Sequence, residues 1–169
     1  GERFWPLSTE VFPKPFVPLT GTQTLIQETV ARLQPLIPKE QIFVSIGRSH
    51  KRVARAQLPE LPASNFIVEP VGRDTSACIA YSALHLERID PDGVMLALPA
   101  DHFIGNPAAF QAAMQRGLES LDGAAGMVFG ITPTRPDTGW LRPGRETRPR
   151  EQNACIGPRR RRPGFEGCP

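Results

Sequence analysis

The sequence predicts an α/β protein with a doubly wound, mostly parallel sheet and helices on both of its faces. Short apolar runs rich in β-branched residues alternate with segments of helical periodicity, and the connections between them are short. One run, at 93–102, is apolar almost throughout, which is typical of a strand covered on both faces. Hydrophobic residues make up 40% and charged residues 22% of the 169, as in a globular protein.

The elements of the first half follow in a regular order. Four prolines within residues 1–21 predict a loop. Apolar residues then recur at helical spacing over 22–36, with Thr22 or Thr24 as a candidate cap. The next elements are a buried strand at 41–47, a polar helix at 49–61 that Pro59 ends, and a second strand at 65–70.

The second half continues the alternation. It predicts a helix at 74–89 capped by Asp74 or Thr75, the strand at 93–102, a helix at 106–121 and a strand at 126–131. A doubly wound sheet normally opens with a strand that feeds a glycine-rich loop. Since no such strand precedes the first loop, we interpret the chain as a fragment with its first strand missing.

The sequence divides into a domain at 1–139 and a tail at 140–169. The tail contains eight Arg, five Pro and four Gly without any helical or strand period, so we expect it to be disordered. It is either a natural basic tail or the product of out-of-frame translation, and we favour the second. The net charge of +3 originates in this tail, because the body is mildly acidic.

Composition also bears on location and partners. No apolar run approaches the roughly 20 residues of a membrane span, so no membrane partner is expected. The three cysteines form neither a metal-binding spacing nor an even disulfide set, which favours a cytoplasmic protein. The run Arg159–Arg162 would adsorb to RNA, but no aromatic residues are interleaved with it, and we expect no nucleic-acid partner.

The first stretch with chemical content is "GERFWPLSTEVFPKP". Gly1 permits close approach to an anion, Arg3 offers a fork of donors that matches phosphate, and prolines on either side restrict the backbone at Lys14. A surface loop with two solvated cations is the alternative. The stretch resembles the phosphate loop of sugar-1-phosphate nucleotidyltransferases, Gly-Gly-x-Gly-x-Arg-(Leu or Phe)-Trp-Pro-Leu-Ser followed by Pro-Lys-Pro. "WPLS" indicates the mannose-1-phosphate guanylyltransferases among them.

That resemblance implies a Rossmann-like fold of the nucleotide-diphospho-sugar transferase type, with roles for these three residues. Gly1 matches the last glycine and would bind nucleotide, while Arg3 and Lys14 would be catalytic. The first two glycines have no counterpart in this sequence.

A second stretch, "EPVGRDTSACIA", resembles the segment that helps to form the family's nucleotide pocket. A glycine before a helix start with free N–H groups suits a phosphate. An ordinary helix cap at Asp74–Thr75 is the alternative, and Asp74 stands where the family more often has Asn. The implied nucleotide-binding residues here are Glu69, Gly72, Arg73, Asp74 and Thr75.

Two further stretches complete the resemblance. "LPADH" places Asp101 at the carboxyl end of the predicted third strand, where a carboxylate could hold Mg²⁺, with His102 in support; a turn aspartate is the alternative. "PDTGW" matches the family's sugar-side segment and implies sugar contacts from Thr138 and Gly139. Trp140 then replaces Tyr, and the family's Glu-Lys-Pro segment and second metal aspartate do not follow.

The implied reaction converts GTP and mannose 1-phosphate to GDP-mannose and pyrophosphate with Mg²⁺. The resemblance is also compatible with a homo-oligomer. We expect this chain, as a truncated fragment, to be inactive. The alternatives are a sister enzyme with another base or sugar, a non-catalytic nucleotide-binding relative, and an RNA-binding module based on the arginine run.

Overall fold

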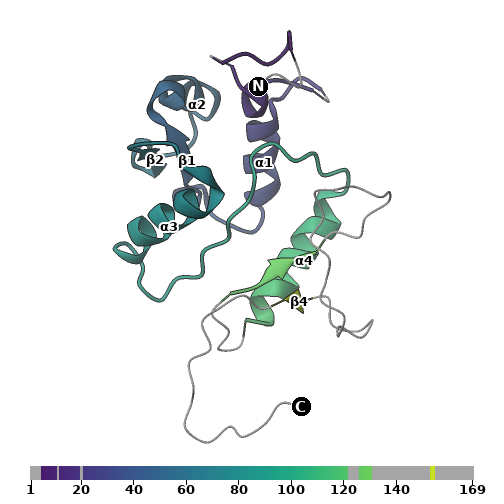
Figure 1. The fold of residues 1–169 in the computed structure, drawn as a ribbon. Coiled ribbons are helices and arrows are strands. Elements are labelled where there is room, and N and C mark those ends of the chain that lie inside the picture. Colours follow the sequence, from purple (N-terminus) through teal and green to yellow (C-terminus); the bar gives the residue numbers. More distant parts are fainter. Residues whose placement is uncertain (1–4, 11, 20, 122–125, 131–152, 155–169) are drawn as a thin grey trace, which may run out of the picture. The chain divides into compact units, whose positions relative to one another are not determined.

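The computed structural model describes residues 5–10, 12–19, 21–121, 126–130 and 153–154. The chain divides into two compact units, residues 1–112 and residues 113–169, which are considered separately. The first unit contains the helices α1, α2 and α3 and the strands β1 and β2 (Figure 1).

The sheet of the first unit is a parallel pair of strands. β1 (Val44–Gly47) pairs with β2 (Phe66–Glu69) in the register Val44 to Phe66 through Gly47 to Glu69. Both strands lie where the sequence predicts them, and their parallel orientation is as predicted. A helix, α2 (Lys51–Gln57), lies between them in sequence, as a parallel connection requires.

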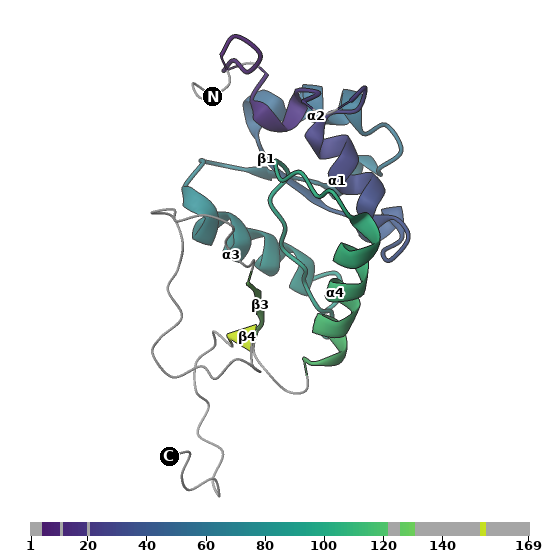
Figure 2. The same ribbon diagram turned by 90° about the vertical axis from the view of Figure 1, so that its right-hand side faces the viewer.

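Helices lie on both faces of this strand pair (Figure 2). Ile46 and Phe66 belong to the buried core together with residues of α1 (Leu25–Leu33) and α2. Phe43, just before β1, instead contacts the ring of His85 on α3 (Asp74–Glu87) at a centroid distance of 6.5 Å. Because side chains alternate along a strand, the two contacts mark opposite faces of the pair. This confirms the predicted covering on both faces.

Hydrogen bonds join the start of α1 to the end of α2. The Thr24 backbone N–H donates to Gln27 Oε1 at 2.9 Å, which makes Thr24 the cap of α1, one of the two predicted candidates. The Thr24 hydroxyl donates to Gln57 Oε1 at 2.8 Å, and Gln57 Nε2 donates to the carbonyl of Phe16 at 3.1 Å. The short 3₁₀ turn Lys14–Phe16 is thereby fixed to both helices.

The predicted third strand is not formed. Residues 94–100 have no assigned strand, and from residue 95 onward their side chains alternate between exposed and half-buried. Leu96, Leu98 and Ala100 pack against the core, whereas Met95 remains 36% exposed. The apolar sequence predicted cover on both faces, but a strand also needs a neighbour to complete its hydrogen bonds, and no described strand pairs with this segment.

The start of α3 also differs from the prediction. Arg73 is the N-cap, and it makes no side-chain capping bond, so neither Asp74 nor Thr75 is the cap. Asp74 is the first helical residue and has a φ of 30°, a value that Asp and Asn tolerate better than most residues. The side chains of the helix are half-buried or exposed throughout.

The second unit contains most of α4 (Pro107–Glu119), which begins in the first, and an antiparallel pair of short strands. β3 (Val128–Phe129) lies in the predicted fourth strand, and it pairs with β4 (Asn153–Ala154). The sequence predicts no strand after 139, so that expectation is wrong for these two residues. Backbone groups alone make the hydrogen bonds of such a pair. A strand this short therefore requires no alternation of apolar and polar side chains.

The rest of the expected tail lies outside the described residues.

No helix in the described part of the chain is both long enough and apolar enough to cross a membrane.

Candidate functional site

The structure brings together two of the residues that the sequence singles out. Lys14 Nζ lies 3.2 Å from Asp101 Oδ2, although 87 positions separate the two residues. Their side chains are 30% and 38% exposed, so the pair lies at the surface with access for a ligand. A ligand that enters from solvent could therefore contact a positive and a negative group at the same place.

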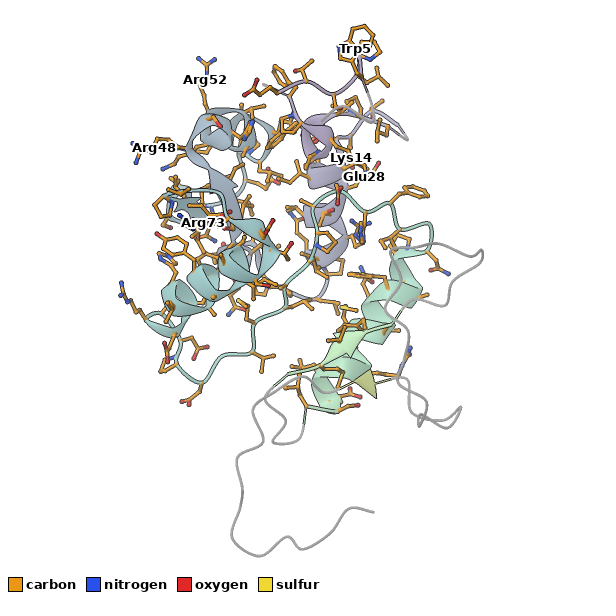
Figure 3. The ribbon with its side chains drawn as sticks, in the orientation of Figure 1. Trp5, Lys14, Glu28, Arg48, Arg52 and Arg73 are labelled. Carbon is orange, nitrogen blue, oxygen red and sulfur yellow. The ribbon has the colours of Figure 1, made fainter. Side chains whose placement is uncertain are left out.

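The backbone at Lys14 is fixed by the contacts that its turn makes with the hydrophobic core. It begins the 3₁₀ turn that ends at Phe16, whose side chain is only 5% exposed. The Phe16 ring meets the ring of His50 at a centroid distance of 6.1 Å, and its carbonyl accepts the bond from Gln57. The backbone at Lys14 is therefore anchored, while its side chain extends from the turn (Figure 3).

Arg32, on α1, supports the loop that carries Asp101. Its Nη2 donates to the Thr29 hydroxyl at 2.6 Å and to the His102 carbonyl at 3.3 Å. Its guanidinium lies 5.6 Å from the centroid of the Phe110 ring, within the range of a cation–π contact. Because His102 directly follows Asp101 in the chain, the bond to the His102 carbonyl holds the backbone next to that carboxylate.

Arg32 is buried, and burial lowers its pKa below the ordinary value of arginine, an effect that the nearby Glu28 carboxylate partly opposes. The sequence interpretation missed this residue. One signal was present, because Arg32 follows Leu25 by seven positions and so lies on the apolar face of the helix. A cation on that face is unusual enough to mark a specific contact.

A divalent cation would find one protein carboxylate here. No three His, Cys, Asp or Glu side chains group together within the described ranges as a metal centre would require. Mg²⁺, however, is often held by one or two carboxylates while phosphates and water complete its shell. Asp101 could hold Mg²⁺ in that mode, as the one protein carboxylate of such a site.

The predicted nucleotide segment lies at the end of β2 and the start of α3. Glu69 accepts a bond from the Ser45 hydroxyl at 3.3 Å, and residues 70–77 are exposed. Nothing lies within 4 Å of the position that a Cβ would take at Gly72, so space remains on that side of the chain. Arg73 and Thr75 are likewise open to solvent.

Four of the predicted site residues lie outside the described part of the chain. They are Gly1, Arg3, Thr138 and Gly139.

The chain matches known proteins over most of its length. Residues 1–140 match the family described as "Nucleotidyl transferase". The chain is 39% identical over 142 residues to the xanthan biosynthesis protein XanB of Xanthomonas campestris, covering 83% of this chain and 30% of XanB. The mannose-1-phosphate guanylyltransferase of Escherichia coli gives the same identity and the same coverage.

Other relatives agree with these. The alginate biosynthesis protein AlgA of Pseudomonas putida is 36% identical over 142 residues, with 83% of this chain and 29% of AlgA covered. Among solved structures, mannose-1-phosphate geranyltransferase from Thermus thermophilus aligns with a TM-score of 0.67 and 36% identity. That alignment covers 80% of this chain and 39% of the other.

These matches confirm the predicted Rossmann-like α/β class, and the chain spans about 30% of the length of the curated relatives it matches. The ion pair described above joins two motifs that both lie inside the matched region. The chain belongs to the nucleotidyl transferase family.

Proposed function

We propose that the protein to which this chain belongs is a mannose-1-phosphate guanylyltransferase that forms GDP-mannose and pyrophosphate from GTP and mannose 1-phosphate. The observation that carries the proposal is the contact between Lys14 and Asp101, two motif residues far apart in sequence. The names of the relatives support the choice of sugar and base, since several are mannose-1-phosphate guanylyltransferases.

The chemistry requires charge and position more than a strong base. An oxygen of the sugar phosphate attacks the α-phosphorus of GTP, a new P–O bond forms, and the bond to the β-phosphate oxygen breaks as pyrophosphate leaves. The nucleophile is already anionic, so no proton need be removed from it. Lys14 and Arg3 would neutralise the departing pyrophosphate, and stabilising the charge that develops at such a point is commonly the main source of rate enhancement.

Asp101 would hold Mg²⁺ against the phosphates, and the bound ion would supply positive charge at the reacting centre. The segment that includes Glu69, Gly72 and Arg73 would bind the nucleotide, with Asp74 and Thr75 at the helix start. Gly1 would line the phosphate loop, and Thr138 and Gly139 would contact the sugar. These assignments rest on the family resemblance together with the exposure of the described members.

The test is a pyrophosphate-release assay on the complete product of the gene. Release should require GTP, mannose 1-phosphate and Mg²⁺ together. Lys14→Ala and Asp101→Ala should each lower turnover by at least about 100-fold, as loss of a charge contact in a transition state does. Lys39→Ala, which removes an exposed lysine elsewhere, is the matched control.

Other outcomes would redirect the proposal. Preference for UTP, dTTP or glucose 1-phosphate would assign the protein to a sister activity. Tight GTP binding without any release of pyrophosphate would indicate a non-catalytic relative.

A further inference from the structure

A second charged site lies on α2, with a different set of residues from Lys14 and Asp101. It is a pocket of about 590 Å³, within the range of small-molecule sites. Figure 3 shows Arg48 and Arg52 directed away from the ribbon at this side of the molecule. The lining residues are Arg48, Lys51, Arg52, Arg55, Ala56, Leu58, Pro59, Leu61 and Phe66.

The four cations of the pocket lie on successive turns of the chain, Arg48 in the 3₁₀ turn Arg48–His50 and the other three on α2. They occupy positions 48, 51, 52 and 55, and side chains three and four residues apart are neighbours on a helix. No carboxylate lines the pocket. Like charges this close repel one another, so an anion bound between them would relieve an unfavourable arrangement.

The base of the pocket is apolar and closely packed. Leu58, Leu61 and Phe66 are 0%, 5% and 5% exposed and belong to the hydrophobic core. Phe66 also begins β2, so the pocket floor is part of the sheet. A ligand there would lie over this packed apolar floor, with the cations around it.

We propose that this pocket binds a small anion that carries several phosphate groups. The fork of each arginine donates two parallel bonds to phosphate oxygens, and Lys51 adds a point charge. A chain of two or three phosphates offers these four side chains more acceptor oxygens and more negative charge than a single phosphate does. This proposal is independent of the proposed transferase activity, because neither Lys14 nor Asp101 lines the pocket.

A small ligand fits better than a nucleic acid. Single-stranded nucleic acids usually need exposed aromatic side chains on which bases stack. The one aromatic residue of the pocket, Phe66, is buried beneath it.

The experiment is a titration of the full chain with sodium tripolyphosphate, followed by the amide NMR signals of each residue. The signals of residues 48–61 should shift and saturate together. The triple variant Arg48→Gln, Arg52→Gln, Arg55→Gln should lose these shifts and bind at least tenfold more weakly at this site. A Lys14→Gln variant should retain them, which separates this site from the transferase site.

The control removes the same charge from other surfaces. The triple variant Lys39→Gln, Arg88→Gln, Arg116→Gln changes exposed residues outside the pocket and should keep the affinity. Equal losses in both triple variants would mean that only net charge matters, which would overturn the proposal. Tighter binding of an RNA oligonucleotide than of tripolyphosphate through residues 48–55 would overturn the small-ligand assignment.

Discussion

At the scale of single residues, Arg32 has the clearest role that the sequence did not reveal. It is 7% exposed and reaches two partners on different elements, so its guanidinium connects α1 to the segment after residue 100. Sequence patterns predicted Lys14 and Asp101 individually from their motifs. Their contact depends on how 87 intervening residues fold, and no local pattern reports that. The role of Arg32 depends on the same tertiary arrangement.

We predict that Arg32→Met loosens the backbone around Asp101 while it changes the free energy of unfolding only slightly. The variant keeps most of the side-chain volume but leaves the His102 carbonyl without its donor. It also removes a buried charge, which offsets part of the loss, so the free energy of unfolding should change by less than about 2 kcal/mol. Amide hydrogen exchange at residues 101–104 should accelerate. Turnover in the proposed guanylyltransferase reaction should fall by tenfold or more. Arg88→Met, at an exposed site, should change neither, and unaltered exchange in Arg32→Met would remove its positioning role.

At the scale of elements, prediction succeeded where local chemistry is sufficient. Val44–Gly47 and Phe66–Glu69 are strands because short β-branched and aromatic runs end at glycine or before proline. The prediction of a strand failed at 94–100. The apolar content of a segment indicates that it is buried, but it does not indicate whether a neighbouring strand exists to pair with it. The start of α3 was also misjudged, because Asp74 takes a left-handed backbone conformation instead of a cap geometry.

We predict that Gln57→Ala destabilises the first unit by about 1–2 kcal/mol. The side chain of Gln57 accepts from the Thr24 hydroxyl and donates to the Phe16 carbonyl, and each such bond contributes about 0.5–1.5 kcal/mol. Urea unfolding followed by circular dichroism gives the difference. Gln34→Ala, at an exposed position at the end of α1, should change the free energy of unfolding by less than about 0.5 kcal/mol. Equal effects of the two substitutions would show that the bonds between α1, α2 and the Lys14 turn contribute nothing specific.

At the scale of the whole molecule, the distribution of apolar surface is uneven. Ile79, Tyr81 and Leu84 on α3 are 38%, 41% and 60% exposed, and Val94 is 57% exposed. Val94 belongs to the segment that the sequence predicts to be covered on both faces, whereas the other three lie on α3. The amphipathic helix α1, by contrast, has its apolar side in the core. The first unit therefore presents apolar side chains of α3 and of residue 94 to solvent.

We predict that this exposed surface makes the chain self-associate through α3. Association should grow with protein concentration and with salt, because apolar contacts strengthen with salting-out ions while charge repulsion is screened. Sedimentation velocity across a hundredfold concentration range measures it. The variant Leu84→Glu, Val94→Lys should sediment more slowly at the highest concentration and bind less of a hydrophobic dye, with α-helix content unchanged. Leu118→Glu on α4 exposes a charge at a residue that is 57% exposed in the second unit, and it should leave the association unchanged. If Leu118→Glu reduced association as much as the double variant did, the contact would not be specific to α3, and the apolar surface of the first unit would not be its cause.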